Sequence, residues 1–286
     1  MQAAVLEWYA ANGRALAFRR TADPWSVLVS EVIAQQTQAA RAAQAWTRLI
    51  DQFRTPAALA AASPATVIRA WRGLGYNRRA IALRAAAIAI VEDHGGRVPD
   101  TYDALVRLPG VGPYTARAVL AIAFDQHVAA LDTNIRRVVG RAFLGGENSL
   151  GARDFQLLAD GFVPRGRAAA WTHALMDVGA AFCRKGEPHC DECPLAPQCR
   201  YLAGGRPPPL SLRRSRKPKP FRSTSRWLRG RILDRLRDAP DGEWVELSGR
   251  IGEHSPDAVL IELGNLAHDR LLELDQGGRA RLRTGP

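Results

Sequence analysis

Lysine is nearly absent from this 286-residue sequence. The chain carries 40 lysine and arginine residues, but its only lysines are Lys185, Lys217 and Lys219. No lysine precedes residue 185, so a mechanism that depends on a lysine nucleophile in that part of the chain is excluded. The basic excess is almost entirely arginine.

Long apolar runs and a recognisable export signal are missing as well. No stretch of about 18 apolar residues occurs, so no segment is expected to span a membrane. Near the N-terminus, Glu7 and Trp8 fall within a helical pattern, and no basic segment precedes an apolar one. We therefore expect no secretory signal and a cytoplasmic location.

The charge of the chain favours an anionic polymer as its partner. The net charge is +12 and the isoelectric point is about 10.5. An arginine-rich composition can also reflect coding bias alone, and that explanation stays open. Residues 206–231 hold ten lysines and arginines, five prolines and no acid, which predicts an exposed basic linker.

Apolar residues recur at helical spacing through residues 1–200, where strand-like alternation is scarce. Beyond the linker, Trp227–Leu236 is expected to be helical, and Ser255-Pro256 to open a second helix that ends near Leu266. Residues 271–282 predict two short strands around Gly277-Gly278. This order of helix, helix and hairpin is typical of a winged-helix module. Earlier in the chain, Ser63-Pro64 is expected to be an N-cap followed by proline at the first position of a helix. The helices expected there cover Trp25–Ile33, Ala42–Phe53, Val67–Trp71, Ile81–Val91, Tyr102–Arg107 and Val119–Phe124.

All four cysteines fall in one window with the spacing C-x6-C-x2-C-x5-C, at Cys183, Cys190, Cys193 and Cys199. Without an export signal, this clustering favours a metal site over disulfides. Zinc suits four thiolates, but its usual pattern is two close pairs set well apart. A loop of six residues before one tight pair suits an iron–sulfur cluster better. Arg184 and Lys185 lie inside that loop, where they are expected to form a clamp for phosphate.

The segment LPGVGPYTARAV, residues 108–119, is a glycine-rich turn that runs into a helix. Gly110 and Gly112 allow a close backbone approach, and the helix that begins at Pro113 offers unpaired N–H groups. A nucleotide-binding loop would follow a strand, whereas the preceding residues Tyr102–Arg107 have a helical pattern. We interpret the segment as a helix-hairpin-helix that grips a DNA backbone phosphate. A plain helix–helix turn is the alternative.

Two carboxylates have the surroundings that acid catalysis needs. On a helix, Glu31 has mainly apolar neighbours, among them Val27 and Leu28, so its pKa is expected to be raised and the group to stay protonated near neutrality. Asp132 lies at the expected start of a helix, where the dipole and free N–H groups favour the ionised form. One protonated acid and one carboxylate make the pair that cleavage through an oxocarbenium-like state requires. On its own, Asp132 is also explained as an ordinary N-cap.

Five motifs in one order resemble the helix-hairpin-helix DNA glycosylases that carry an iron–sulfur cluster. The similarity covers about residues 1–200 and is closest to the adenine DNA glycosylases (MutY type), in a short form without the MutT-like C-terminal domain. It implies a mainly α fold of two lobes with DNA between them and the target nucleotide flipped into the cleft. The motifs are SEVIAQQTQ (30–38), GLGY (73–76), LPGVGPYTA (108–116), LDTNIRRV (131–138) and the cysteine spacing.

The resemblance also sets the expected domain boundaries. A six-helix barrel lobe with the helix-hairpin-helix is expected at 22–129, and an iron–sulfur cluster lobe at 1–21 together with 130–202. A basic flexible linker at 203–224 and a winged-helix-like α+β module at 225–286 complete the chain. The four cysteines are then the ligands of a 4Fe–4S cluster.

The similarity assigns a role to each matched residue. Glu31 resembles the acid that protonates the adenine ring, and Asp132 the carboxylate that stabilises the sugar cation. Gln36 and Tyr76 resemble the residues that wedge into the duplex beside the opposite base. Tyr114 takes the position at which the bifunctional endonuclease III carries a lysine, so the enzyme is expected to remove a base without lysine-based strand cleavage.

Several positions depart from the family pattern. Ala17-Phe18-Arg19 stands where Pro-Trp-Arg is usual, and Asn77 replaces a second tyrosine. His173 occupies a position at which glutamine or glutamate often holds the base. For His173, a contact with the base and a buried structural role are both open. Phe18, Arg19 and His173 are the expected base pocket.

The predicted function is that of a monofunctional base-excision-repair glycosylase, which hydrolyses the N-glycosidic bond of adenine mispaired with guanine or 8-oxoguanine. The expected partner is double-stranded DNA with a mismatch or an oxidised base, bound by a monomer associated with the nucleoid. A mismatch thymine/uracil glycosylase is the alternative, because that relative also carries tyrosine at the position of Tyr114. A bifunctional pyrimidine lyase and a non-catalytic DNA-binding regulator are more distant alternatives. A regulator would not explain why an acid, Glu31, is placed among apolar residues.

Overall fold

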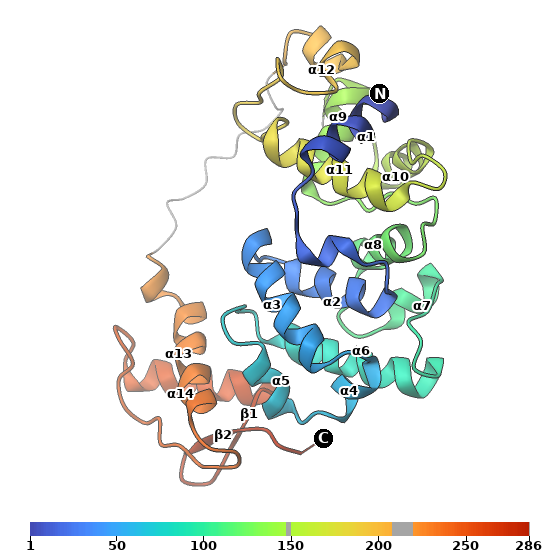
Figure 1. The fold of residues 1–286 in the computed structure, drawn as a ribbon. Coiled ribbons are helices and arrows are strands. Elements are labelled where there is room, and N and C mark those ends of the chain that lie inside the picture. The colour runs from blue at the N-terminus through green and yellow to red at the C-terminus, as the bar shows by residue number, and fades with distance from the viewer. Residues whose placement is uncertain (147–149, 208–219, 286) are drawn as a thin grey trace. The chain divides into compact units, whose positions relative to one another are not determined.

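The computed structural model describes residues 1–146, 150–207 and 220–285. Within these ranges the chain is mainly helical, as the sequence predicted, and its two short strands lie near the C-terminus (Figure 1). No helix in the described part of the chain is both long and apolar enough to cross a bilayer. Most of the predicted basic linker, residues 208–219, lies outside the described residues.

The chain divides into two compact units that alternate along the sequence. The first unit comprises Met1–Glu31, Asp100–Arg107 and Val111–Arg214, and the second comprises Val32–Pro99, Leu108–Gly110 and Ser215–Pro286. This division falls at different residues from the predicted lobes, 22–129 and 1–21 with 130–202. Those lobe boundaries remain a prediction.

Helix α11 (Ala168–Ala181) is the element around which the first unit packs. It contacts α1 (Gln2–Asn12), α8 (Pro113–Ala123) and α9 (Thr133–Leu144). Trp171 and Leu175 of α11 are almost fully buried in the core of this unit, and large apolar side chains of this kind supply most of the stabilisation of a helical core. The other helical segments of the unit are η1 (Ala17–Arg20), most of α2 (Pro24–Ala34), α7 (Tyr102–Arg107), α10 (Ala152–Gly161), η2 (Ala196–Gln198) and α12 (Arg200–Ala203).

Helix α6 (Arg78–His94) is the longest helix of the second unit and packs against α4 (Pro56–Ala61) and α5 (Pro64–Ala70). It ends at Gly95, whose φ of +58° is the left-handed conformation that favours glycine after a helix. Helix α3 (Ala39–Gln52) belongs to the same unit and buries only small and aliphatic side chains of one face. The predicted helices are therefore confirmed, with ends shifted by a few residues.

Two of the predicted helix starts are confirmed by their caps. The Ser63 hydroxyl accepts a hydrogen bond from the backbone N–H of Thr66 at 3.1 Å, and the Ser255 hydroxyl accepts one from that of Ala258 at 3.3 Å. A proline follows each serine at the first helical position, where no backbone N–H is needed. The side chains thus satisfy donors that the helix itself leaves unpaired.

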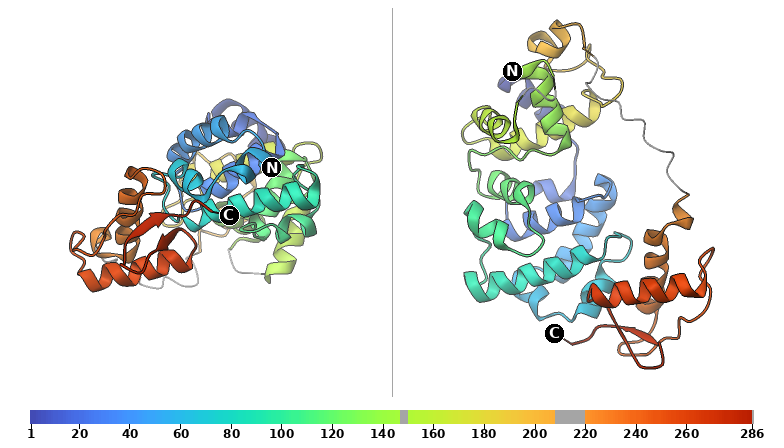
Figure 2. Two further views of the ribbon diagram at one scale, coloured as in Figure 1. Left: turned by 90° about the horizontal axis from the view of Figure 1, so that it is seen from below. Right: turned by 180° about the vertical axis from the view of Figure 1, so that it is seen from behind.

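The end of the second unit has the predicted order of helix, helix and hairpin. After α13 (Ser225–Asp238) and α14 (Pro256–His268), strand β1 (Leu272–Leu274) pairs antiparallel with β2 (Ala280–Leu282). Val245 forms an additional bridge to Ala280. Figure 2 shows these elements gathered beside one another. We call residues 221–285 the C-terminal module.

Regular structure in the C-terminal module begins before the predicted boundary at residue 225. Phe221–Ser223 form a single helical turn, η3, within the segment predicted as linker 203–224. The turn packs against α13, whose N-cap Thr224 accepts a hydrogen bond from the backbone N–H of Trp227 at 3.3 Å. The cap fixes where the helix starts, and η3 sets the direction from which the chain enters it.

Candidate active site

The carboxyl group of Glu31 is buried in the first unit. Glu31 lies on α2 with 7% of its surface exposed, and Val27 and Leu28 on the preceding turn are almost completely buried. Burial raises the pKa of Glu31 from an ordinary 4.5 to about 7, because the charged form loses its hydration. The raised pKa predicted from the sequence is confirmed. Near neutral pH the group exchanges between its protonated and ionised forms.

Tyr114 is a direct hydrogen-bonding partner of Glu31. It is the second residue of α8, after Pro113. Burial, together with the nearby carboxyl groups of Glu31 and Asp132, raises the pKa of Tyr114 well above its ordinary value, so the phenol stays neutral and donates to the carboxylate. This bond stabilises ionised Glu31 and partly opposes the effect of burial on its pKa. From the sequence, we predicted only that Tyr114 cannot act as a lysine nucleophile. The structure adds that its hydroxyl group contacts the carboxyl group of Glu31.

Asp132 is the N-cap of α9, as predicted. Its Oδ1 accepts a hydrogen bond from the backbone N–H of Ile135 at 2.6 Å, and its Oδ2 accepts one from the side-chain amide of Asn134 at 3.1 Å. These bonds lower the pKa of Asp132, as the sequence predicted for a carboxyl group at the start of a helix. Burial raises the pKa of Asp132 by more than these hydrogen bonds lower it, so the value lies above the ordinary one. The negative charge of Asp132 in turn raises the pKa of Glu31.

A buried ion pair lies beside these carboxyl groups. Both amino groups of the Arg19 guanidinium bind the Asp177 carboxylate, at 2.8 and 2.9 Å, and Arg14 binds the same carboxylate through its Nε at 2.7 Å. Burial disfavours ionised Asp177, but these bonds outweigh it and hold its pKa below the ordinary value. The positive charge of Arg19 lowers the pKa of Glu31. The sequence prediction missed Asp177, although an acid within the apolar helical stretch WTHALMDVGA was the available signal.

The predicted base pocket contains two buried nitrogen atoms with no hydrogen-bond partner in the described part of the chain. They are Arg19 Nε and His173 Nδ1. Burial and the neighbouring Arg19 lower the pKa of His173 to about 3, so its ring is neutral and offers one donor and one acceptor nitrogen. Phe18 precedes Arg19 on η1 and is partly buried. Unpaired buried polar atoms are rare in folded proteins, so each of these nitrogen atoms is a candidate for a contact with a bound molecule.

A chain of hydrogen bonds joins Asp132 to the cysteine window. Asn134, which donates to Asp132, accepts a hydrogen bond from Arg137 at 2.7 Å. Arg137 also donates to the backbone carbonyls of Gly179, at 2.9 Å, and Cys183. A side chain at Gly179 would come within 2.6 Å of the Asn134 Cβ, so glycine is required for this close approach. The position of Asp132 therefore depends on the segment that carries the first cysteine.

The four cysteines line one cavity in the first unit. Arg141 also lines it, with a guanidinium that lies 4.9 Å from the centre of the Tyr201 ring and donates to the Arg184 carbonyl at 2.6 Å. Arg184 and Lys185 themselves are exposed. Among the described residues, no group of three or more His, Cys, Asp or Glu side chains is arranged to hold a single metal ion. The cavity is lined by Cys183, Cys190, Cys193 and Cys199, with Phe182, His189 and Tyr201 among its other residues.

The two glycines of the predicted phosphate-gripping turn have different roles. Gly110 has a φ of +77°, and a side chain there would come within 2.8 Å of the Ala82 Cβ, so the turn itself requires glycine. Gly112 has an ordinary φ of −91° and caps α8, and a side chain there would meet no protein atom within 4 Å. Open space above the backbone N–H groups at the start of a helix is what a phosphate needs.

Gln36 and Tyr76, the predicted wedge residues, lie in the second unit, and both have an unusual backbone. Their φ angles are +57° and +43°, a conformation uncommon for residues other than glycine. Arg79 holds both loops, since it donates to the carbonyls of Val32 at 2.9 Å and Leu74 at 3.1 Å and also to that of Gln35. The sequence prediction missed Arg79, because its partners are fixed by tertiary structure.

Comparison with known proteins identifies the family. Residues 29–157 match the family described as HhH-GPD superfamily base excision DNA repair protein. The adenine DNA glycosylase of Mycolicibacterium smegmatis is 40% identical over 237 residues, which cover 82% of this chain and 80% of that protein. The chain belongs to the adenine DNA glycosylase family. The matched residues include Glu31, Tyr114 and Asp132, so these three residues of the site lie within the region that matches the family.

Two solved structures share the fold of this family member. A thermostable thymine-DNA glycosylase gives a TM-score of 0.66 at 28% identity, covering 71% of this chain and 94% of that one. Endonuclease III in a trapped covalent intermediate with DNA gives a TM-score of 0.60 at 24% identity, covering 70% and 93%. The predicted helix-hairpin-helix glycosylase fold is confirmed, and the chain is a DNA glycosylase of base excision repair.

The burial of Glu31 predicts a characteristic pH dependence of stability. The pKa of Glu31 rises from 4.5 to about 7 on folding. The folded protein therefore loses stability relative to the unfolded chain as the pH increases through that range, because the folded state must then ionise a buried group. Glu31→Gln removes this loss. At pH 8 the variant should be more stable than the wild type by up to about 3 kcal/mol, and the difference should vanish below pH 4.5.

Urea unfolding at pH 5 and pH 8 measures this difference. Glu7→Gln on the exposed surface of α1 is the matched control and should not change the pH dependence. Equal stability of Glu31→Gln and wild type at pH 8 would show that Glu31 ionises without cost in the folded protein.

Proposed function

We propose that this protein hydrolyses the N-glycosidic bond of adenine mispaired with guanine or 8-oxoguanine in double-stranded DNA. The observation that carries the proposal is the buried Glu31 carboxyl, with a pKa of about 7, hydrogen-bonded to Tyr114 and within the electrostatic field of Asp132. A buried acid that titrates near neutrality beside a second carboxyl is the arrangement that acid-catalysed glycosidic cleavage requires. The adenine glycosylase from Mycolicibacterium smegmatis supports adenine as the base.

The chemistry follows from the two carboxyl groups. Protonated Glu31 gives its proton to a ring nitrogen of adenine while the bond between that base and the sugar breaks, so the base leaves neutral. The electrons of the bond go to the base, and the sugar carbon becomes an oxocarbenium-like cation. The Asp132 carboxylate stabilises this cation, and water adds to it. The proton released from the water restores Glu31.

The two unpaired nitrogen atoms of the base pocket give the adenine edge a place to bind. Arg19 Nε carries a donor, which suits a ring nitrogen of a purine. Neutral His173 can present either an acceptor for the exocyclic amine or a donor, according to its tautomer. The pocket therefore supports a flipped base that is held by its edge, with Phe18 beside it.

The product is predicted to be an abasic site in an intact strand. A lyase reaction needs an unprotonated amine that attacks the sugar and forms an imine. Tyr114 occupies the position of the lysine in bifunctional relatives, and no lysine precedes residue 185. The neutral phenol of Tyr114 is engaged with Glu31 instead.

DNA is proposed to contact both units through groups that do not read sequence. The turn at Gly110 and Gly112 offers backbone N–H groups to a phosphate, and Arg184 and Lys185 offer charge. Gln36 and Tyr76 are exposed, as a wedge requires. We expect a monomer that acts at the nucleoid in the cytoplasm.

The cavity lined by four thiols supports a 4Fe–4S cluster held by Cys183, Cys190, Cys193 and Cys199. Four thiolates are the ligand set that such a cluster takes, and buried Arg141 beside them balances negative charge. When bound, the cluster would fix the loop between the first two cysteines. The chain of hydrogen bonds from Cys183 through Arg137 and Asn134 would then also hold Asp132 in place.

A mismatch thymine or uracil glycosylase is the second candidate. The observation that favours it is the likeness to a thermostable thymine-DNA glycosylase, with a TM-score of 0.66 at 28% identity. The neutral His173 ring does not decide between the bases, because thymine also presents both a donor and an acceptor. A non-catalytic DNA-binding regulator would have no use for the buried acid.

One assay separates these functions. Purified protein is incubated with duplexes that carry adenine, thymine or uracil opposite guanine and 8-oxoguanine, and the strands are analysed with and without alkali. We expect release of adenine alone, strand breaks only after alkali, and little or no trapping by borohydride. Glu31→Gln should abolish release, because the amide keeps the shape but cannot give a proton. Release of thymine but not adenine would establish the second candidate, and efficient trapping would contradict the monofunctional mechanism.

Iron analysis tests the proposed cluster. The wild-type protein should be brown and contain about four irons per chain, as the resemblance to glycosylases with a 4Fe–4S cluster implies. Cys193→Ser should lose iron and bind DNA more weakly, because Arg184 and Lys185 lose their fixed loop. His189→Ala is the control, since His189 lines the same cavity without being a proposed ligand, and it should keep its iron. Stoichiometric zinc in a colourless, active wild-type protein would contradict the proposal.

A further inference from the structure

The C-terminal module is joined to the loop that carries the wedge residue Tyr76. Ala65 and Ile68 of α5 share one apolar core with Leu228 and Ile232 of α13. The backbone N–H of Ala65 also donates to the carbonyl of Arg283 at 2.8 Å. Because α5 leads directly into the GLGYN loop, residues 73–77, the module and this loop are parts of one packed structure within the second unit.

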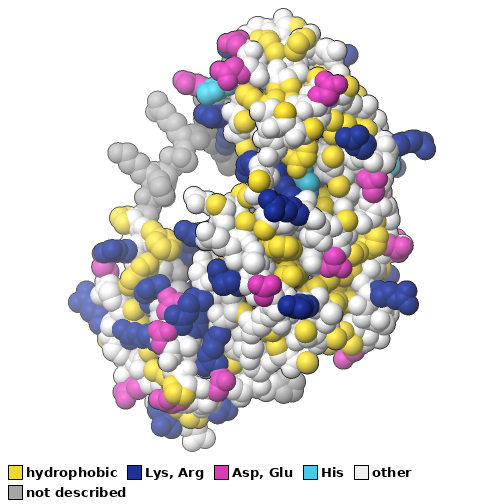
Figure 3. Space-filling model, viewed as in Figure 1, with side chains coloured by type: hydrophobic (Ala, Val, Ile, Leu, Met, Phe, Trp, Pro, Cys, Tyr) yellow, Lys and Arg dark blue, Asp and Glu magenta, His cyan; other side chains and the backbone are white. Residues whose placement is uncertain are grey.

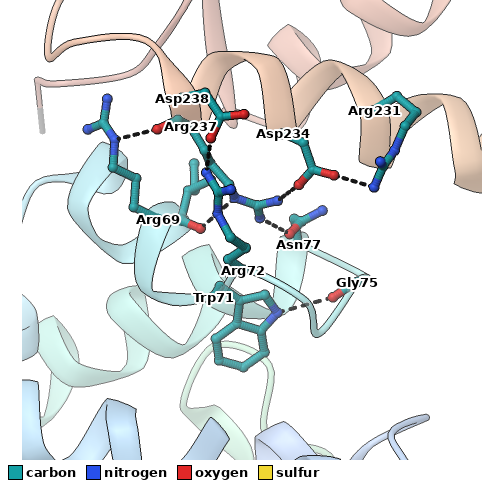
Figure 4. Close-up of polar contacts among 10 residues, drawn as sticks. Arg69, Trp71, Arg72, Gly75, Asn77, Arg231, Asp234, Arg237 and Asp238 are labelled. Atoms are coloured by element: carbon teal, nitrogen blue, oxygen red, sulfur yellow. Dashed lines mark hydrogen bonds and ion pairs between the residues drawn. The ribbon is translucent and has the colours of Figure 1, made fainter.

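Buried Arg237 anchors the end of the GLGYN loop (Figure 4). Its side chain is 3% exposed and donates to the Ile68 carbonyl at 3.0 Å, to the Asn77 side chain at 2.7 Å and to Asp234 at 2.9 Å. Asn77 stands where the family pattern has a second tyrosine. Its amide oxygen provides the acceptor that the Arg237 guanidinium needs, so this departure from the pattern is matched by a residue of the C-terminal module.

Tyr76, one residue earlier, contacts the module through exposed groups. Arg226 donates to the Tyr76 hydroxyl at 2.7 Å, and its guanidinium carbon lies 5.2 Å from the centre of the Tyr76 ring and 4.9 Å from that of Phe221. Tyr76 is 44% exposed and Phe221 is 54% exposed. The three side chains therefore form an exposed group of two aromatic rings with an arginine between them, which we call the Tyr76–Arg226–Phe221 platform.

The chemistry of this platform fits an unpaired nucleobase. Aromatic rings and arginine planes stack on bases that have left the duplex, and guanidinium N–H groups pair with the acceptor edge of a guanine. Figure 3 shows further arginine side chains gathered over the C-terminal module, which favours a nucleic acid over an apolar partner. A glycosylase that extrudes adenine leaves one base without a partner, and that base is the purine opposite.

We propose that the Tyr76–Arg226–Phe221 platform binds the purine opposite the extruded adenine, so that the C-terminal module takes part in reading the mismatch. This inference rests on the proposed function. It assigns a function to the C-terminal module, for which the sequence alone indicated no binding partner. Arg226 supplies the donors for the purine edge, and Phe221 supplies a stacking surface. Tyr76, whose ring lies between Arg226 and Arg79, positions Arg226, and Arg237 holds the loop in place through Asn77.

Binding measured in a Glu31→Gln background tests the proposal without turnover. Full-length protein is titrated with duplexes that carry adenine opposite guanine, opposite 8-oxoguanine or opposite an abasic-site analogue. Arg226→Ala and Phe221→Ala should each weaken binding to the two purine duplexes by about tenfold, as expected for the loss of one stacking partner, and should hardly change binding to the abasic duplex. Arg226→Lys should behave like Arg226→Ala, because lysine keeps the charge but lacks the planar donor group.

Arg235→Ala is the matched control, since Arg235 is an exposed arginine on the opposite face of the same helix. It should leave the preference for a purine unchanged. Equal weakening of all three duplexes by Arg226→Ala would show a phosphate contact and overturn the proposal, and so would an effect no larger than that of Arg235→Ala. The proposed function fails separately, if protein with Glu31 intact releases adenine from none of the duplexes.

Discussion

Glu31 is an acid kept from water by the apolar turn of α2, and this burial is the constraint to which the other groups of the site respond. In water a glutamic acid is ionised at neutral pH and has no proton to give. Beside buried Val27 and Leu28 its pKa rises to about 7, so the group can hold a proton near neutral pH. The same burial lowers the free energy of unfolding at pH values at which Glu31 ionises. A carboxyl group that stays protonated near neutral pH is therefore obtained at a cost in stability.

The neighbours of Glu31 adjust this pKa in both directions. Tyr114 and Arg19 favour the ionised form, whereas Asp132 favours the protonated form. Arg19 in turn is held by Asp177, so its charge is largely balanced within the protein. Ionised Glu31 would therefore rely mainly on its hydrogen bond with Tyr114, as the proposed acid needs once it has given up its proton.

Sequence patterns predicted those parts of the structure that depend on neighbours in the chain. The helix start at Ser63, the cap at Asp132 and the apolar surroundings of Glu31 all follow from residues within four positions. The resemblance to a family then supplied the expected roles of Glu31, Tyr114 and Asp132, which remain a proposal, whereas the family membership is confirmed.

Partners distant in the sequence were not predictable in this way. Asp177 binds Arg19 across 158 positions, and Arg237 binds Asn77 across 160. Neither pair leaves a local pattern, because only the packing of the helices brings its members together. The upward effect of burial on the pKa of Asp132 was missed for a related reason, since this burial depends on elements other than its own helix.

The ionisation of Glu31 in the folded protein can be measured directly. Protein labelled with carbon-13 at the glutamate side chains is titrated by NMR, and the Glu31 signal is assigned by its absence from Glu31→Gln. Because Glu31 is buried, we expect a titration midpoint near pH 7 for this signal. A midpoint near 4.5 would contradict it, because Glu31 would then be a solvated carboxylate with no proton to give at neutral pH.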